Sequence, residues 1–496
     1  MIPCDLSATQ ARRLLSSKQL SVVELAESCI ARAEAVNPAV NALVSYNHDL
    51  MLTQARDAQR EIDQGKPLGV LHGLPLCVKD MVDVVGFPTT YGSELYADNI
   101  ATSDDPMITQ LRQAGVVIMG KTNNPEWSAG GNTRNAVYGV TANPFDLSRS
   151  AGGSSGGSAV AVACGMAPLA TGSDTGGSLR SPAAFNGVVG FRPSPGVVPG
   201  SQRSLALLPL STSGPMARTV ADTALMLSAM IRPDRRDPWV SVVEEKSHHN
   251  PDSYTHLPSS DLSSARVAVT HDFGFAITES LIAETFLDKL HRFGHVFASL
   301  EHTHPDCHGA DRAFSVLRGL LFSGHHRELV RNHPSKVGPN IKANVKEGAS
   351  FSALDVVEAM NLQTQIYRRW QTFFERHDFI IAPTTTISPR NWHELYPSEI
   401  DGKPMESYYH WLSMAYASTL VGHPSITLPA GRDLNGLPFG LQIIGRRGED
   451  LATLAFAQEL EALFNTVPEL SRPQVDTKSL CNAQPLSFSE GFLGFG

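Results

Sequence analysis

The chain has 496 residues, of which 42% are hydrophobic and 18% are charged, and its formal net charge is −9 at pH 7. This composition excludes an intrinsically disordered chain, and the short basic run at 232–236 is too small to serve as an electrostatic surface for nucleic acid. The length exceeds that of an average single core and predicts two or more domains, or one large domain with insertions.

Residues 1–70 are predicted to form an N-terminal helical segment. Two serines are each followed three residues later by Gln or Glu, the spacing of a capping box at a helix start: Ser7 with Gln10, and Ser21 with Glu24. The helix after Ser21 is expected to end before Pro38, because proline has no backbone N–H to continue a helix.

The N-terminus and the cysteines indicate a cytoplasmic protein. No charged segment followed by an apolar one begins the chain, and no run of about 18 apolar residues predicts a membrane span. The six cysteines are irregularly spaced, so we expect no disulfide framework. Cys77 and Cys164 lie in apolar runs and are expected to be buried thiols.

From Gly73 onward, short apolar runs bounded by glycine or polar residues predict buried strands. They lie at 73–80, 115–122, 167–175, 265–271, 378–384, 425–430 and 439–445. Helical patterns lie between them, for example at 220–231 and 450–464. Strands that alternate with helices predict an α/β fold, in which helices cover both faces of a sheet.

Two stretches differ from this pattern. Residues 232–378 are richer in His, Asp and Arg and largely helical after Ala310, so we expect an insertion that covers a pocket. Residues 468–496 have weak periodicity and are expected to form a surface tail.

The run RSAGGSSGGSAVAVACG, at 149–165, has the Gly/Ser content of a flexible linker. It continues into small apolar residues, and no charged residue occurs between Arg149 and Asp174, which favours a buried segment. Its Gly152-Gly153-Ser154 unit is repeated as Gly176-Gly177-Ser178. A glycine pair before a serine exposes backbone N–H groups, as an oxyanion hole requires.

A serine nucleophile needs a base, and no histidine occurs between His72 and His249. Lys79 lies in an apolar strand, where burial lowers the pKa of an amine and makes it a usable base. The spacing alone favours a structural salt bridge from Lys79 to Asp80 or Asp174 over the role of a base. A distant histidine such as His72 or His423 remains an alternative base.

The segment 121–196 resembles the amidase signature family, through Gly-Gly-Ser-Ser-Gly-Gly-Ser, Gly-Ser-Asp-Thr-Gly-Gly-Ser and Pro-Ala-Ala-Phe. The resemblance covers nearly the whole chain and is weakest over 232–378 and after 468. It implies a large mixed sheet flanked by helices on both faces, with 71–231 as the core that holds the catalytic triad and 379–467 as the C-terminal part of that core.

The resemblance also implies a role for each site residue. Ser178 matches the nucleophile, Ser154 the bridging serine after a cis peptide bond, and Lys79 the base. The backbone N–H groups of an oxyanion hole would be those of Thr175, Gly176, Gly177 and Ser178, braced by Ser155, Asp174 and Arg180. Trp127, Gly130 and Gly131 are expected at the substrate pocket, although Trp127 fits a packed core side chain equally well.

The implied reaction is hydrolysis of the carbon–nitrogen bond of a small amide, without metal or cofactor. The expected partners are the substrate and a second copy of the chain, in a homodimer, with no nucleic acid or membrane. Alternatives are an ester or carbamate hydrolase, an inactive binding protein, and the glutaminase subunit of a tRNA-dependent amidotransferase. That subunit usually has a Leu-Lys-Pro-Thr-Tyr-Gly-like run where this chain has GFRPSPGVVPG at 190–200.

Three further motifs compete with this interpretation. Gly152–Gly156 fits the nucleophile elbow of α/β-hydrolases, but the turn-like residues before it do not provide the strand that the elbow needs. No Gly-Lys-Ser/Thr follows, as a P-loop would require. Four potential metal ligands lie close together in the sequence, at His302, His304, Cys307 and His308. Their spacing indicates a metal site only weakly, and a surface loop explains the segment better.

Overall fold

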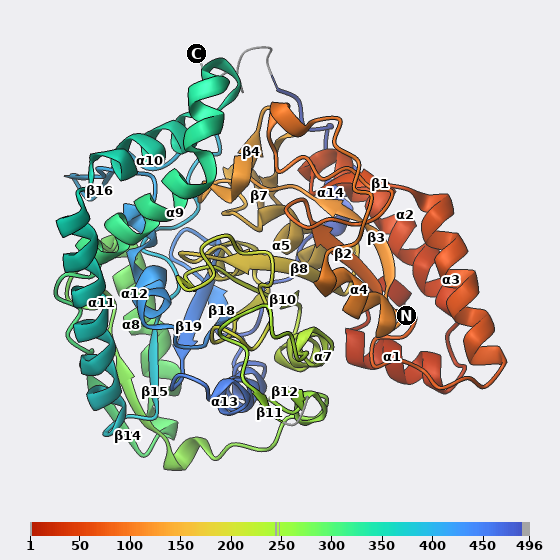
Figure 1. Cartoon of the computed structure of the whole chain (residues 1–496). Helices are drawn as coiled ribbons and strands as arrows, with labels where there is room; N and C mark the ends of the chain where they lie inside the picture. Colours follow the sequence, from red (N-terminus) through yellow and green to blue (C-terminus); the bar gives the residue numbers. More distant parts are fainter. Residues whose placement is uncertain (1, 244–245, 248, 489–496) are drawn as a thin grey trace.

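The computed structural model describes residues 2–243, 246–247 and 249–488. Its centre is an 11-stranded mixed sheet, in the order β1-β3-β2-β8-β10-β9-β18-β19-β15-β13-β14 (Figure 1). The bounds are β1 Leu43–Tyr46, β2 Pro75–Lys79, β3 Val117–Thr122, β8 Leu169–Asp174, β9 Val189–Arg192, β10 Thr212–Ala217, β13 Arg266–Val269, β14 Ser299–His302, β15 Phe379–Pro383, β18 Ser425–Arg432 and β19 Pro438–Ile444.

Four two-stranded sheets accompany the large one. They are β4 Arg134–Asn135 with β5 Gly139–Val140, β6 Ala142–Asn143 with β7 Asp146–Ser150, β11 Val242–Val243 with β12 Lys246–Ser247, and β16 Glu399–Ile400 with β17 Lys403–Pro404. The turn-like interpretation of the residues before Gly152 is therefore wrong over β7. This strand pairs with β6 and forms an isolated bridge from Arg149 to Asn391, and it lies outside the large sheet.

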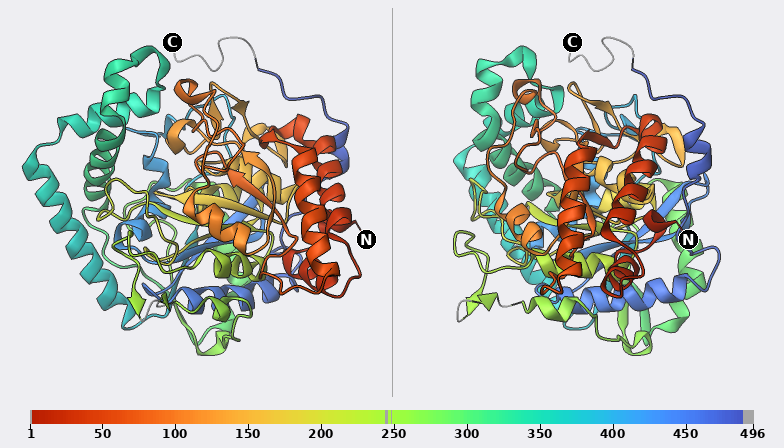
Figure 2. Two further views of the ribbon diagram at one scale, coloured as in Figure 1. Left: turned by 45° about the vertical axis from the view of Figure 1, so that its right-hand side comes forward. Right: turned by 90° about the vertical axis from the view of Figure 1, so that its right-hand side faces the viewer.

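The α-helices of the described residues flank the sheet. They are α1 Ala8–Ser16, α2 Val22–Val40, α3 His48–Asp63, α4 Pro106–Gln113, α5 Gly156–Ala163, α6 Arg180–Asn186, α7 Val220–Met230, α8 Ser280–Phe293, α9 Ala310–Asn332, α10 Pro339–Ser350, α11 Ala353–Phe374, α12 Ser413–Val421, α13 Asp450–Phe464 and α14 Thr477–Cys481. Helices α1–α3 and α9–α11 lie at opposite sides of the molecule (Figure 2). No helix in the described ranges is long and apolar enough to cross a membrane.

The strand register shows that helices cover both faces of the sheet. Gln442 of β19 lies opposite Ala382 of β15 and accepts a hydrogen bond from Arg180 at the start of α6. Phe379 of β15 stacks on Phe456 of α13, with ring centroids 3.9 Å apart. Side chains alternate along a strand, so Phe379 and Ala382 point to opposite faces. Helices α6 and α13 therefore cover opposite faces, which confirms the predicted fold class.

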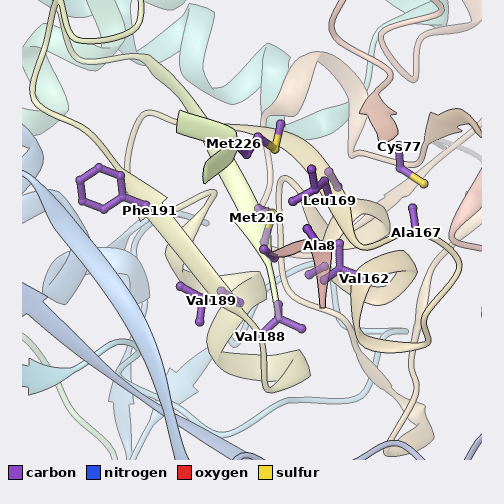
Figure 3. Close-up of a cluster of buried hydrophobic side chains, with 14 of the residues drawn as sticks. Ala8, Cys77, Val162, Ala167, Leu169, Val188, Val189, Phe191, Met216 and Met226 are labelled. Atoms are coloured by element: carbon purple, nitrogen blue, oxygen red, sulfur yellow. The ribbon is translucent and has the colours of Figure 1, made fainter. Parts of the chain in front are cut away.

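The buried apolar side chains of the described residues form two clusters, one with helices α9–α12 and one with β2, β8 and β10 and helices α1–α3, α5 and α7. Figure 3 shows apolar side chains from β2, α5, β8, β10 and α7 in contact, among them Cys77, Val162, Leu169, Met216 and Met226. Each Val, Leu or Met side chain of this kind contributes about 1.5–3 kcal/mol to stability when fully buried. Cys77 and Cys164 are buried as predicted, and all six cysteines are free.

Both predicted capping boxes are present, at Ser7 and Ser21, and all seven predicted strands form. Two predictions for the N-terminal segment are wrong. Helix α2 continues through Pro38 to Val40, because Asn41 caps it in the left-handed conformation and the Asn37 side chain accepts hydrogen bonds from the next two backbone N–H groups. Residues 1–70 are also not purely helical, since β1 joins the edge of the sheet.

Candidate active site

Lys79 is the last residue of β2 and is completely buried. Its Nζ lies 2.6 Å from Oγ of Ser154 and 3.1 Å from Oγ of both Ser155 and Ser173. The salt-bridge alternative is not found: no carboxylate of the described residues lies within 4.0 Å of this amine, and Asp80 pairs instead with Lys121 at 3.1 Å. The amine of Lys79 is thus surrounded by hydroxyl groups.

This burial has a direct effect on the charge of Lys79. Removal from water lowers the pKa of the amine to about 7, and the negative charge of Asp174 opposes the shift only in part. An amine with this pKa is largely neutral at mildly alkaline pH. It can then accept a proton from the hydroxyl of Ser154, which lies within hydrogen-bond distance.

The first glycine–serine turn places Ser154 against Lys79. The Gly153–Ser154 peptide bond is cis, as the family resemblance implied. The next residue, Ser155, connects the two turns: its N–H donates to the carbonyl of Ser178 at 3.1 Å. Its hydroxyl also accepts from the N–H of Ser173 at 3.3 Å. The two serine turns, 24 residues apart, therefore lie side by side.

The second turn follows β8 and contains Ser178. The N–H groups of Thr175, Gly176 and Ser178 donate to no group of the described residues, so they are available to a substrate oxygen. Gly177 differs from the expected set of four donors, because its N–H donates to Oδ1 of Asp174 at 2.8 Å. Its φ of +111° favours glycine, and a Cβ there would lie 2.7 Å from the Cβ of Ala415.

A buried ionic network holds this turn. Asp174 accepts two hydrogen bonds of 3.0 Å from Arg180 and one of 3.2 Å from Arg192. Burial alone would raise the pKa of Asp174, but the two guanidinium groups hold it well below its ordinary range. Arg180 also donates to Ser418 and Gln442. Removal of one partner from such a network costs about 3–5 kcal/mol, so the turn is rigidly supported.

A cavity of about 680 Å³ lies against the two turns. Lys79, Ser154, Thr175, Gly176 and Ser178 line one side of it. Helix α9 lines another side with residues that share one helical face, Phe314, Arg318, Leu321, Phe322, His325, His326 and Leu329. The glycine–serine turns therefore face a space of the size that takes a small organic molecule.

Comparisons with known proteins agree with this geometry. The family model named Amidase matches residues 24–454. The chain belongs to the amidase family. An acylamidase of Rhodococcus erythropolis is 35% identical over 95% of this chain and 97% of its own length. A glutamyl-tRNA(Gln) amidotransferase subunit from Ruminiclostridium cellulolyticum is 31% identical over 93% of this chain and 97% of its own length.

The fold comparison gives the same family. A bacterial aryl acylamidase of the amidase signature family superposes with a TM-score of 0.86 and 28% identity, covering 97% of this chain and 99% of the other. This amidase is thus a hydrolase of carbon–nitrogen bonds other than peptide bonds.

The residues expected at the substrate pocket of this amidase divide into two groups. Trp127 and Gly130 line the cavity. Trp127 stacks on Tyr91, with ring centroids 4.5 Å apart, and its backbone has a left-handed φ of +49°, a strained conformation that is common at functional sites. Gly131 does not line the cavity: a Cβ there would lie 2.2 Å from the Trp411 ring, so it serves close packing instead.

The alternative bases lie elsewhere. His72 hydrogen-bonds the carbonyl of Ala58, and His423 hydrogen-bonds that of Gly445. Burial lowers the pKa of His423 to about 4. Neither histidine lines the cavity. The segment 302–308 joins no group of three or more potential metal ligands within the described residues.

Three residues of the site were missed from the sequence, two beside Lys79 and one in the Asp174 network. Ser173 contacts the Lys79 amine, and Thr171 accepts the Lys79 backbone N–H at 3.0 Å. Their spacing of two along a strand, which puts both side chains on one face, was the available signal. The place of Arg192 in the Asp174 network was missed as well, although a charge at the end of an apolar strand was a signal for a buried ion pair.

Proposed function

We propose that this amidase hydrolyses small linear amides through an acyl-enzyme on Ser178. The contact that carries the proposal is the 2.6 Å hydrogen bond from the Lys79 amine to Ser154, in a cavity that Ser178 also lines. A lysine with a pKa of about 7 and no carboxylate partner among the described residues can act as a base, and its nearby proton donors are serine hydroxyls.

The proposed sequence of steps begins with neutral Lys79. It takes the proton of Ser154, which takes that of Ser178 as the Ser178 oxygen attacks the amide carbon. The N–H groups of Thr175, Gly176 and Ser178 stabilise the oxyanion. The carbon–nitrogen bond then breaks, and the leaving amine receives the proton through Ser154. Water, deprotonated by the same relay, cleaves the ester and releases the acid.

A second candidate function is the glutaminase reaction of an amidotransferase subunit, because such a subunit is 31% identical to this chain. The run at 190–200 departs from that of the subunits, which favours a stand-alone enzyme. Ester or carbamate cleavage by the same serine is a third candidate, since the acyl-enzyme step is common to these substrates.

Ammonia or amine release by the purified chain tests the proposal. We expect the purified chain to turn over acetanilide and hexanamide without any added protein, because a stand-alone amidase needs no partner to complete its site. A phenyl ester and a phenyl carbamate complete the substrate set. Turnover of glutamine alone, and only after a partner protein is added, would contradict the proposal.

We also propose that the region 232–378 forms a variable wall of the cavity. A further proposal is that the chain forms a homodimer. The exposed apolar side chains of Leu207, Leu354, Val357 and Met360 support a self-association surface. Light scattering of the purified chain should give twice the mass of 53.5 kDa, and Met360→Glu should lower it to one chain. A single-chain mass at every concentration would refute the dimer.

The six free cysteines support a reducing, cytoplasmic location, which cell fractionation tests.

A further inference from the structure

Helix α9 carries polar groups into the cavity beyond the catalytic serines. Its Phe314 touches the second serine turn: a Cβ at Gly176 would lie 3.0 Å from the Phe314 ring. Arg318 follows four residues later on the same face and lines the same cavity. The Cα atom of Arg318 therefore lies on the order of 6 Å further along the helix than that of Phe314.

Arg318 is buried without an acidic partner. Its side chain is 5% exposed, and its guanidinium lies over the rings of Phe322 and Tyr408, at 4.2 and 5.0 Å from the ring centroids. It makes no hydrogen bond or ion pair with any of the described residues, and its Nε is completely enclosed. Burial lowers its pKa only to about 10, so it remains a cation at neutral pH. The carboxylate of Glu347, whose charge partly opposes this lowering of the Arg318 pKa, makes no ion pair with Arg318 and accepts a hydrogen bond from Tyr409.

The other buried arginines of the site make a clear contrast. Arg180 and Arg192 are both paired with Asp174 and hydrogen-bonded to further groups. An unpaired guanidinium in a low-dielectric site costs several kcal/mol, and its attraction for an anion is correspondingly strong. Its planar fork of donors matches the two oxygens of a carboxylate.

Two more polar groups without a hydrogen-bond partner among the described residues belong to residues that line the cavity with Arg318. They are Nδ1 of His326, two turns further along α9, and the hydroxyl of Tyr408, in residues that are 8% and 4% exposed. Burial and the neighbouring charges of His325 and Arg318 lower the pKa of His326 to about 3, so it is neutral and can donate one N–H. The cluster of Arg318, His326 and Tyr408 thus offers three kinds of donor.

We propose that Arg318, His326 and Tyr408 bind a carboxylate of the substrate, so that the preferred substrates are amides bearing a second, acidic group. The inference rests on the proposed amidase activity of the cavity. It adds a specificity site to that activity: the catalytic turns hold the amide, and α9 holds the acid. Asp83 and Asp105 are the aspartates that line the cavity, and neither forms an ion pair with Arg318.

Three substrates of one length test the specificity site. They are adipic acid monoamide, 6-hydroxyhexanamide and hexanamide, which end in a carboxylate, a neutral hydroxyl and a methyl group. We expect the acid to have the highest kcat/KM. In Arg318→Met, the ratio of kcat/KM between the acid and hexanamide should fall about 100-fold, because the fork of donors is gone. Arg318→Lys, which keeps the charge, should recover part of the ratio.

The matched control is Arg327→Met. Arg327 lies on the same helix, but it is 69% exposed at its side chain and pairs with Glu328 on the surface. The control should keep the wild-type ratio. An equal loss on all three substrates in Arg318→Met would indicate a structural role and would overturn the specificity site. Equal wild-type rates for the acid and the hydroxy amide would overturn it too.

Binding separates this inference from the proposed activity. In calorimetry, adipic acid monoamide should bind the Ser178→Ala variant, and the further change Arg318→Met should weaken binding about 100-fold. Turnover of hexanamide without this difference in binding would refute the specificity site alone. Binding without turnover of any amide by the wild type would refute the proposed function and leave the carboxylate site in place.

Discussion

Replacement of Ser178 by alanine is expected to lower kcat by about 10⁴-fold or more on any amide substrate, with KM little changed. Without the Ser178 oxygen no acyl-enzyme forms, and the three free N–H groups of its turn have no oxyanion to stabilise. The fold should be preserved, because no hydrogen bond of the Ser178 hydroxyl supports the described structure. Steady-state kinetics and a melting curve measure both effects.

The matched control is Ser201→Ala, which changes another serine that lines the cavity. We expect its kcat to stay close to that of the wild type. A sulfonyl fluoride should label Ser178 in the wild type, as peptide mass spectrometry would show. If the label appeared on Ser154 or Ser155 while Ser178 stayed free, the roles of the serines would have to be exchanged.

Lys79→Met should be folded and inactive over the whole pH range. In the wild type, kcat/KM should rise about tenfold per pH unit below pH 6 and level off above pH 8, because only neutral Lys79 accepts a proton and its pKa is about 7. Methionine fills nearly the same space without an amine. A pH profile of kcat/KM between 5 and 9 measures the ascending limb and its loss.

The lowered pKa also has an effect on stability. Between about 7 and the ordinary value of 10.5 the unfolded chain binds more protons at Lys79 than the folded chain. The free energy of unfolding should therefore rise with pH across this window, and Lys79→Met should lack that rise.

Lys121→Met is the matched control, since Lys121 is also buried but is paired with Asp80. It should lower the melting temperature, because it leaves Asp80 unpaired, and leave the midpoint of the kcat/KM profile in place. Substantial activity of Lys79→Met with an unchanged profile would refute the serine–lysine relay.

The strands could be predicted from the sequence where an apolar run bounded by glycine coincides with a position buried inside the sheet. β2 and β3 are apolar runs bounded by glycine, and both are buried on two faces. β10 was missed because Gly214 and Pro215 argue against a central strand. It forms because β8 and β9 pair with it on either side, and this pairing depends on residues far along the chain.

The residues of the site were likewise predictable only in part from the sequence. The family motif named the residues around both serine turns, but the motif does not show that the Gly177 N–H is bound by Asp174. Gly131 was expected at the pocket from the family resemblance, whereas its neighbour in space is Trp411. Arg318 has no ion-pair partner among the described residues because of the way separate elements pack around it. No local sequence pattern predicts this environment.

The division of the cavity between the sheet and α9 has a consequence for evolution and engineering. Lys79 and Ser178 are fixed by the sheet and its ionic network, whereas Arg318 and His326 project from a helix that packs mainly on α10 and α11. Mutations on the cavity face of α9 can thus alter substrate preference while the chemical step keeps its geometry. A gene library confined to these α9 positions should therefore give folded variants that keep Ser178, the proposed nucleophile, and that differ in substrate preference.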